Sequence, residues 1–169
     1  MNVASITGFL EWLQALPLAV FIHQKAWAFT TVEVVHVFAI SMVIATIMIV
    51  DLRLLGFASK KRPVSELSRQ VLPFTWAAFV LAVIAGSLLF ISKATDYFVN
   101  PMFWIKMALI VIAGINMVIF EFITVRSVKE WNLDPTPPPQ ARLAGGISIA
   151  CWVLVLVCGR LIAFTLPME

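Results

Sequence analysis

The sequence predicts an all-α integral membrane protein, a four-helix bundle with an N-terminal amphipathic helix at the membrane interface. Three observations predict this class. Of the 169 residues, 62% are hydrophobic and only 12% are charged. The apolar residues form long runs that can cross a hydrocarbon core of about 30 Å as helices. Ahead of these runs, apolar residues recur at helical spacing opposite polar ones. We treat 1–169 as a single membrane domain whose first partner is the lipid bilayer.

The N-terminal segment 5–25 is predicted to lie in the interface rather than to span, because only one of its faces is apolar. In the second predicted span, Ala78, Ala82 and Gly86 recur every four residues, which predicts close approach of a neighbouring helix. The predicted spans are 27–57, 72–92, 101–125 and 141–166.

The third span is predicted to begin at Asn100 and Pro101, because Asn caps helices and Pro fits the first helical turn. The loop 53–70 is the most basic connection, which predicts that it lies in the cytoplasm. The N- and C-termini then face the periplasm of a bacterial inner membrane. Asp51 and Arg53 at this end are interpreted as a topology anchor, paired with each other or with Arg142.

A layer of ionisable residues is predicted in the opposite half of the membrane. Glu33 and His36 are three residues apart and share a helix face. At about 1.5 Å per residue, Glu33, Lys106 and Arg160 lie at similar depths in the first, third and fourth spans, with His36 one turn deeper. Ionisable groups at membrane depth are costly, so their alignment predicts a pocket.

Two structural interpretations compete with the pocket. Lys106 and Arg160 lie near helix ends and can extend to the interface. Alternatively, Glu33 pairs with one of them and locks the bundle. A stripe of Gly146, Val153 and Arg160, seven residues apart, predicts that Arg160 faces inward.

The predicted pocket suits a redox cofactor such as haem b for electron transfer. His36 would be the axial or proton-active group, Glu33 its hydrogen-bonding partner, and Lys106 and Arg160 would hold anionic groups. A bis-histidine site needs a second imidazole, and His23 is the other histidine in the chain. On one helix the two would lie about 20 Å apart, so they meet one metal only if the N-terminal helix folds back. A single-histidine haem with an open or methionine sixth position is the other form.

Two further functions stay open. One is a non-enzymatic site for a metal or a small anionic ligand in a transport system, and the other is a structural membrane subunit. The small-residue faces also fit a homo-oligomer or a larger membrane complex. Methionines in the spans are interpreted as packing rather than as Cu(I) ligands. The net charge of +3 comes without a basic stripe, which argues against nucleic-acid binding. No catalytic motif appears, and the sequence does not decide whether the chain is an enzyme.

The segments 33–56, 72–90, 100–116 and 141–164 resemble a family of bacterial four-helix inner-membrane proteins with no assigned function. The motifs E-x-x-H and D-L-R-L-L-G carry most of this resemblance. More distantly, the region of Gly86 and Lys106 is similar to the copper-resistance D type of membrane protein. The helix count and the lone intramembrane histidine resemble membrane protoporphyrinogen oxidases and small cytochromes b, although the second haem histidine of the cytochromes has no match here. These distant resemblances are analogies of fold.

Overall fold

The computed structural model describes residues 3–59, 61–120, 131–134 and 136–165. All regular secondary structure in these ranges is helical. The helices are α1 (Val3–Gln14), α2 (Pro17–Gln24), α3 (Ala26–Leu54), α4 (Val64–Ser92), α5 (Ala94–Val99), α6 (Pro101–Ile119) and α8 (Pro139–Thr165).

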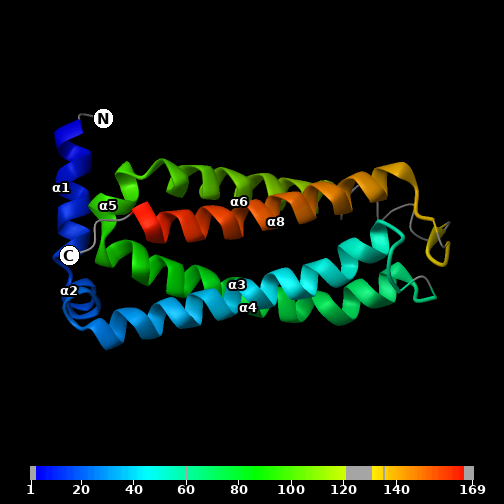
Figure 1. Cartoon of the computed structure of the whole chain (residues 1–169), viewed down its shortest axis with the longest axis horizontal. Coiled ribbons are helices and arrows are strands. Elements are labelled where there is room, and N and C mark those ends of the chain that lie inside the picture. Colours follow the sequence, from blue (N-terminus) through cyan, green and yellow to red (C-terminus); the bar gives the residue numbers. More distant parts are fainter. Residues whose placement is uncertain (1–2, 60, 121–130, 135, 166–169) are drawn as a thin grey trace.

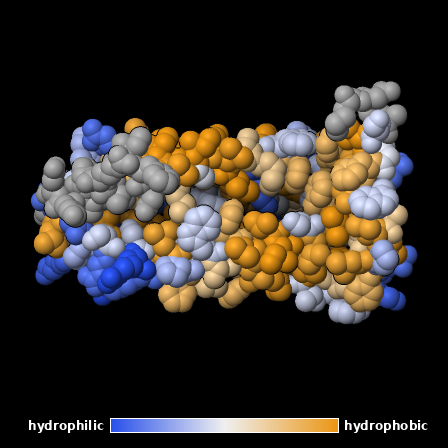
Figure 2. Space-filling view, turned by 180° about the vertical axis from the view of Figure 1, so that it is seen from behind, coloured by the Kyte–Doolittle hydropathy of each residue, from blue (hydrophilic) through white to orange (hydrophobic). Residues whose placement is uncertain are grey.

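Four helices, α3, α4, α6 and α8, are long and apolar enough to cross a membrane, as the sequence predicts. The pair α1 and α2 bends by 68°, and it would add a fifth span only if the bent pair counted as one. The long helices run side by side, and α1 lies across one end of them (Figure 1). Hydrophobic residues cover the middle of the bundle, and hydrophilic residues gather toward its two ends (Figure 2). We name these the α1 end and the loop end, the latter carrying residues 55–63.

The helix boundaries differ from the predicted ones in three places. The N-terminal segment forms two helices, because Pro17 starts α2 where its missing N–H is not needed. Helix α4 begins at Val64 rather than at 72 and continues through Pro73. The segment between the second and third predicted spans forms the short helix α5. The predicted ends of the third and fourth spans, 125 and 166, lie outside the described residues.

The predicted start of the third span is confirmed. Asn100 Oδ1 accepts a hydrogen bond from the backbone N–H of Met102 at 2.9 Å, and Pro101 is the first residue of α6. The Asn100 amide also donates to the Thr165 hydroxyl at 2.8 Å. This one side chain therefore caps α6 and ties it to the end of α8.

The long helices form two hairpins, α3 with α4 and α6 with α8, which meet where α3 packs on α8. Helices α4 and α6 have little backbone contact. Near α5, the rings of Phe90 and Phe103 stack with their centroids 5.3 Å apart. The predicted close approach along α4 is confirmed, because Ala78 and Ala82 are buried and Gly86 lies under a side chain of α3. The bundle is thus closely packed between α3 and α4, between α6 and α8 and between α3 and α8, and loosely packed between α4 and α6.

Arg53 closes the loop end. It is fully buried, and its guanidinium donates to the carbonyl oxygens of Arg62, Asn132 and Asp134 at 3.0–3.2 Å. Because these carbonyls belong to the two inter-helix connections at this end, Arg53 fastens one hairpin to the other. The Asn132 side chain adds hydrogen bonds with Ser65 at the start of α4.

The predicted pairing of Asp51 with Arg53 or Arg142 is wrong. Residues two apart on a helix do not face each other. Arg53 therefore points to the loop carbonyls, whereas Asp51 points into the bundle. Arg142 is exposed on α8.

The closeness of α3 and α8 gives a test of the fold. A Cβ added at Gly145 would lie 3.0 Å from the Asp51 carbonyl oxygen and 3.2 Å from Leu54 Cβ. Because neither atom ends a flexible side chain, Gly145→Ala should lower the free energy of unfolding by about 1 to 3 kcal/mol. Gly146→Ala is the control, since its Cβ meets Leu55 at 4.0 Å and Ala favours helix by about 1 kcal/mol. Thermal unfolding in detergent measures both, and equal midpoints would contradict the tight contact.

Candidate functional site

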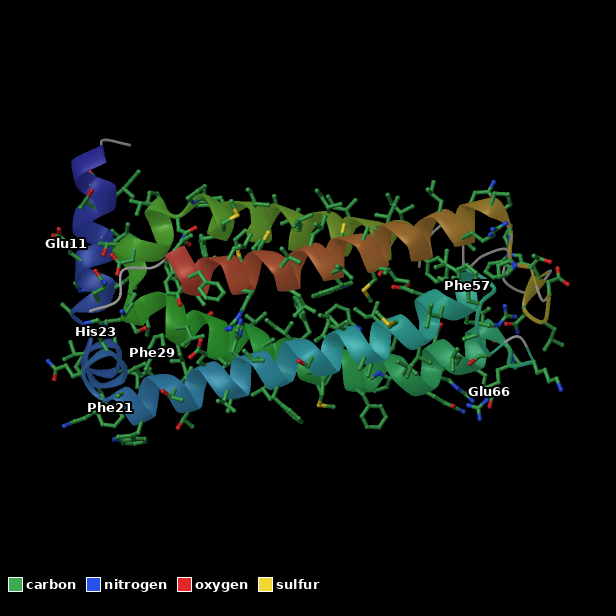
Figure 3. All side chains as sticks on the ribbon, in the orientation of Figure 1. Glu11, Phe21, His23, Phe29, Phe57 and Glu66 are labelled. Atoms are coloured by element: carbon green, nitrogen blue, oxygen red, sulfur yellow. The ribbon has the colours of Figure 1, made fainter. Side chains whose placement is uncertain are left out.

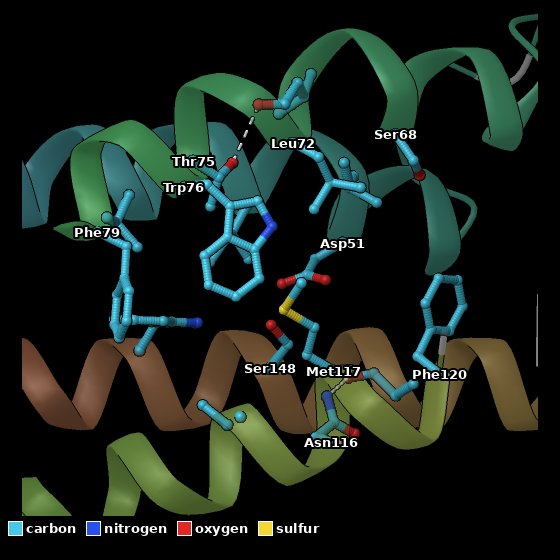
Figure 4. Close-up of a pocket in the computed structure, with 18 of the residues that line it drawn as sticks. Asp51, Ser68, Leu72, Thr75, Trp76, Phe79, Asn116, Met117, Phe120 and Ser148 are labelled. Carbon is cyan, nitrogen blue, oxygen red and sulfur yellow. Dashed lines mark hydrogen bonds between the residues drawn. The ribbon is translucent and has the colours of Figure 1, made fainter. Parts of the chain in front are cut away.

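A cavity of about 230 Å³ lies between the two hairpins, in the half of the bundle nearer the loop end. All four long helices line it, and the walls are mainly aliphatic and aromatic side chains (Figure 4). The lining stretches are 43–54 of α3, 68–79 of α4, 110–120 of α6 and 144–152 of α8. The cavity therefore lies beside α4 and α6, the two neighbouring helices that have little backbone contact.

The exposure of the lining residues shows where the cavity opens. Two of them are exposed, Trp76 on α4, with 51% of its surface accessible, and Gly114 on α6. The lining residues of α3 and α8 are all buried or half-buried. Because α4 and α6 have little backbone contact, the opening lies between them. This opening is on the side of the bundle rather than at either end.

Asp51 is the ionisable residue that lines this cavity. It is 5% exposed, and its Oδ2 has no hydrogen-bond partner among the described residues. The Ser148 hydroxyl of α8 lies within hydrogen-bonding reach of the carboxyl group. In Figure 4 the carboxyl group points toward Ser148 and Met117. A buried carboxyl oxygen without a donor is costly in a medium without water, so Asp51 is the polar centre of the cavity.

Two other polar side chains of the cavity have already committed their donors. The Thr75 hydroxyl donates to the Thr46 hydroxyl at 2.9 Å. The Asn116 amide donates to the Ala144 carbonyl oxygen at 3.0 Å, which ties α6 to α8. Among the fully buried polar atoms of the described lining residues, Oδ2 of Asp51 is the one without a partner.

The sequence analysis missed this cavity, because it interpreted Asp51 as a topology anchor. A signal was present on α8. Gly145 and Ser148 are a small and a hydroxyl residue three positions apart, so they share the face that meets Asp51. Such a pair opposite a carboxylate indicates a contact inside the bundle rather than at the interface.

His36, from the predicted polar layer, lies between the cavity and the α1 end. Its Nδ1 is 2.9 Å from the Ala82 carbonyl oxygen, and its Cε1 is 2.8 Å from where a Cβ of Gly86 would lie. Because a carbonyl only accepts, Nδ1 carries the proton. The neutral ring then leaves Nε2 as an acceptor or metal ligand.

Lys106 is brought near His36. Its Nζ lies 3.5 Å from where a Cβ of Gly159 would be, so the side chain runs along α8, and its charge acts on the imidazole. No ion pair joins Glu33 to Lys106 or Arg160 in the described part of the chain. His36 and Lys106 are thus the two predicted residues that share a location.

Glu33, on the α1 side of His36, acts on Tyr97 of α5. Burial raises the pKa of Tyr97 to about 12, and the negative charges of Glu33 and Asp96 act in the same direction. The Tyr97 hydroxyl therefore stays protonated at any physiological pH.

Arg160 and His23 lie apart from the layer. Arg160 is exposed, and its guanidinium lies 4.8 Å from the centroid of the Phe164 ring. The predicted inward stripe of α8 is wrong, because Val153 is also exposed. His23 is exposed on α2 at the α1 end (Figure 3), whereas His36 lies about 15 Å inside α3. The buried residues of α8, which form its inward face, are Ala141, Gly145, Ser148, Cys151, Val155, Cys158 and Ile162.

No group of three or more His, Cys, Asp or Glu side chains in the described ranges could hold a metal ion. His36 is the predicted ligand whose ring nitrogen remains available inside the bundle.

A protein-family model matches residues 9–165. The chain belongs to the DUF6644 family, a family of unknown function. This confirms the resemblance to an uncharacterised family, and it shows no link to copper-resistance D proteins or to cytochromes b. No curated protein and no solved structure matches the chain. The function is therefore argued from the geometry.

The contact of His36 with Gly86 can be tested by a double-mutant cycle. Gly86→Ala should push the ring off the Ala82 carbonyl and cost about 1 kcal/mol of unfolding free energy. In a His36→Ala background the added methyl group has room, so Gly86→Ala should be neutral or stabilising. Thermal unfolding of the four proteins gives a coupling energy of about 1 kcal/mol.

Gly114→Ala is the control for this cycle, since no atom lies within 4 Å of its added Cβ. It should be neutral or stabilising in both backgrounds. If Gly86→Ala has the same effect with and without the imidazole, the two residues are not in contact.

Proposed function

We propose that this chain is a membrane binding protein for a small lipophilic molecule. The molecule enters from the bilayer between α4 and α6 and places a polar group beside Asp51. One observation carries the proposal: Asp51, a buried acid whose Oδ2 has no hydrogen-bond partner among the described residues, lines an apolar cavity of about 230 Å³. Apolar pockets with few, well-placed polar groups are the common form of small-molecule sites.

The size of the cavity limits the ligand. Small-molecule pockets range from about 300 to 1,000 Å³, so this cavity lies just below the small end. It suits a body of one or two rings or a short branched chain. A porphyrin would require the hairpins to move apart, and Arg53 and Asn100 hold the two ends of the bundle together.

The opening sets the route. The gap between α4 and α6 is flanked by Trp76 and Gly114, and at the depth of the spans it faces hydrocarbon. A ligand that uses it must first dissolve in the membrane. Burial of its apolar body then favours binding less than it would from water, so the polar contact with Asp51 supplies much of the selectivity.

A substitution that fills part of the cavity tests this proposal. Gly114→Phe projects a ring into the cavity from a position where an added Cβ meets no atom within 4 Å. A neutral bromoaryl alcohol is titrated into the protein in lipid nanodiscs, because bromine quenches the fluorescence of the lining residues Trp76 and Trp152. We expect saturable quenching, with an affinity about tenfold weaker in the variant, because the ring displaces the probe.

Ile115→Phe is the matched control. It adds a ring at the neighbouring exposed position of α6, which does not line the cavity. Its affinity should match that of the unmodified protein. Quenching that rises linearly with probe and is the same in all three proteins would show partition into lipid alone, and the proposal would then be wrong.

Haem b binding for electron transfer is the second candidate, and the orientation of His36 supports it. The Nδ1–H of His36 is held by the Ala82 carbonyl, which is the arrangement that orients a ligating imidazole. Lys106 nearby would attract a propionate. His36 would supply one axial ligand, and the hairpins would have to move apart to admit the porphyrin beside it. A bound haem would supply one-electron chemistry.

Expression with added haem tests the second candidate by visible spectroscopy. Haem bound at His36 should give a Soret band that His36→Ala removes. His23→Ala should leave the band unchanged, because His23 lies at the α1 end. A protein without a Soret band, or a band that survives His36→Ala, would remove this candidate.

A further inference from the structure

The cavity carries information about the charge of its ligand. Asp51 is the one ionisable group in its lining, and no Lys, Arg or His side chain among the described residues shares the wall. An anionic ligand would meet an uncompensated carboxylate in a medium of low dielectric constant, where like charges repel strongly. The charge balance of the wall therefore excludes anions.

The hydrogen bonds of the lining residues also favour a cationic ligand over an anionic one. The Thr75 hydroxyl and one N–H of the Asn116 amide already donate to other protein groups. The Asp51 carboxyl group has an oxygen, Oδ2, without a partner among the described residues. A ligand that brings only acceptors, such as a quinone carbonyl, adds no favourable contact to this carboxyl group, whereas a positive group is attracted to it.

The aromatic side chains supply the second contact that a cation needs. Four aromatic residues line the cavity, and they come from three helices. In Figure 4 Trp76 extends from α4 into the space next to Asp51, Phe79 lies on the far side of Trp76, and Phe120 lies on the α6 side. Aromatic faces attract cations through their quadrupole, most strongly where water is excluded. The remaining aromatic lining residue is Trp152.

We propose that the cavity binds a lipophilic organic cation, an amine or quaternary ammonium group on a small aromatic or branched body, with its charge beside Asp51. This rests on the proposed function, because it assigns the chemical class of the ligand for the same cavity. The apolar walls take the body, the aromatic rings and the Asp51 carboxyl group take the charge, and the opening between α4 and α6 admits a molecule dissolved in the membrane.

Two probes of equal shape test the charge. One is 4-bromobenzyltrimethylammonium, and the other is its neutral isostere with carbon in place of the nitrogen. Both are titrated into the protein in nanodiscs of zwitterionic lipid, with tryptophan quenching as the measurement. We expect the cation to bind at least about tenfold more tightly than the isostere, since only the cation is attracted to the Asp51 carboxylate and to the aromatic faces.

Asp51→Asn removes the charge at nearly constant shape. It should weaken the cation by about tenfold or more and leave the neutral isostere within about twofold, so the isostere also reports that the variant is folded. Glu66→Gln is the control, because Glu66 is an exposed acid at the start of α4 that does not line the cavity. Its affinities should match those of the unmodified protein.

The outcomes separate the two proposals. If the isostere binds saturably, is displaced by Gly114→Phe, and binds as tightly as the cation, the cavity receives lipophilic molecules but the charge assignment is overturned. The same conclusion follows if Asp51→Asn keeps the full affinity for the cation. If neither probe binds saturably, both proposals fail. The comparison of the two probes in the unmodified protein decides the question even where Asp51→Asn does not fold.

Discussion

Inside a bilayer no water is available to pair with polar groups, and this constraint shapes the interior of the bundle. The hydroxyls of Thr31, Ser41 and Thr46 donate to carbonyl oxygens of the preceding helical turn. Longer polar side chains reach across to a neighbouring helix, as His36 and Asn116 do. Asp51 departs from this rule with a carboxyl oxygen that has no donor. Our functional argument depends on that departure.

Small residues decide which helices approach closely. Gly86 accommodates the imidazole of α3, and Gly145 lets the backbone of α3 come near α8. Helix α6 lacks such a contact with α4, and large side chains such as Trp76 occupy the interval. Bilayers give helices no hydrophobic driving force to close such a gap, because lipid tails are as apolar as the side chains they would replace. An apolar space on this side is therefore stable.

The sequence predicted the four long helices, the cap at Asn100 and the small-residue face of α4, because hydropathy, capping and spacing are local properties of a chain. It missed α5 and the early start of α4, where helix continues past charged residues that sit beyond the apolar run. It placed His36 and Lys106 together correctly but expected Arg160 to face them. A seven-residue spacing shows that residues share one face of a helix but does not show whether that face points into the bundle. The buried residues of α8 lie on another face. Asp51 was misread because a carboxylate near a helix end looks the same whether it faces loops or the interior.

The two hairpins are fastened at both extremities, by Arg53 at one and by the contact of Asn100 with Thr165 at the other. Because both ends are fixed, the gap between α4 and α6 can widen slightly at its middle, but the two hairpins cannot separate. Passage of a ligand between α4 and α6 would then depend on rotation of the Trp76 side chain rather than on movement of the two hairpins relative to each other. Such rotations are fast compared with domain motions. If the cavity binds a ligand as we propose, exchange takes place at constant shape, unlike in carriers that alternate between two faces of a membrane.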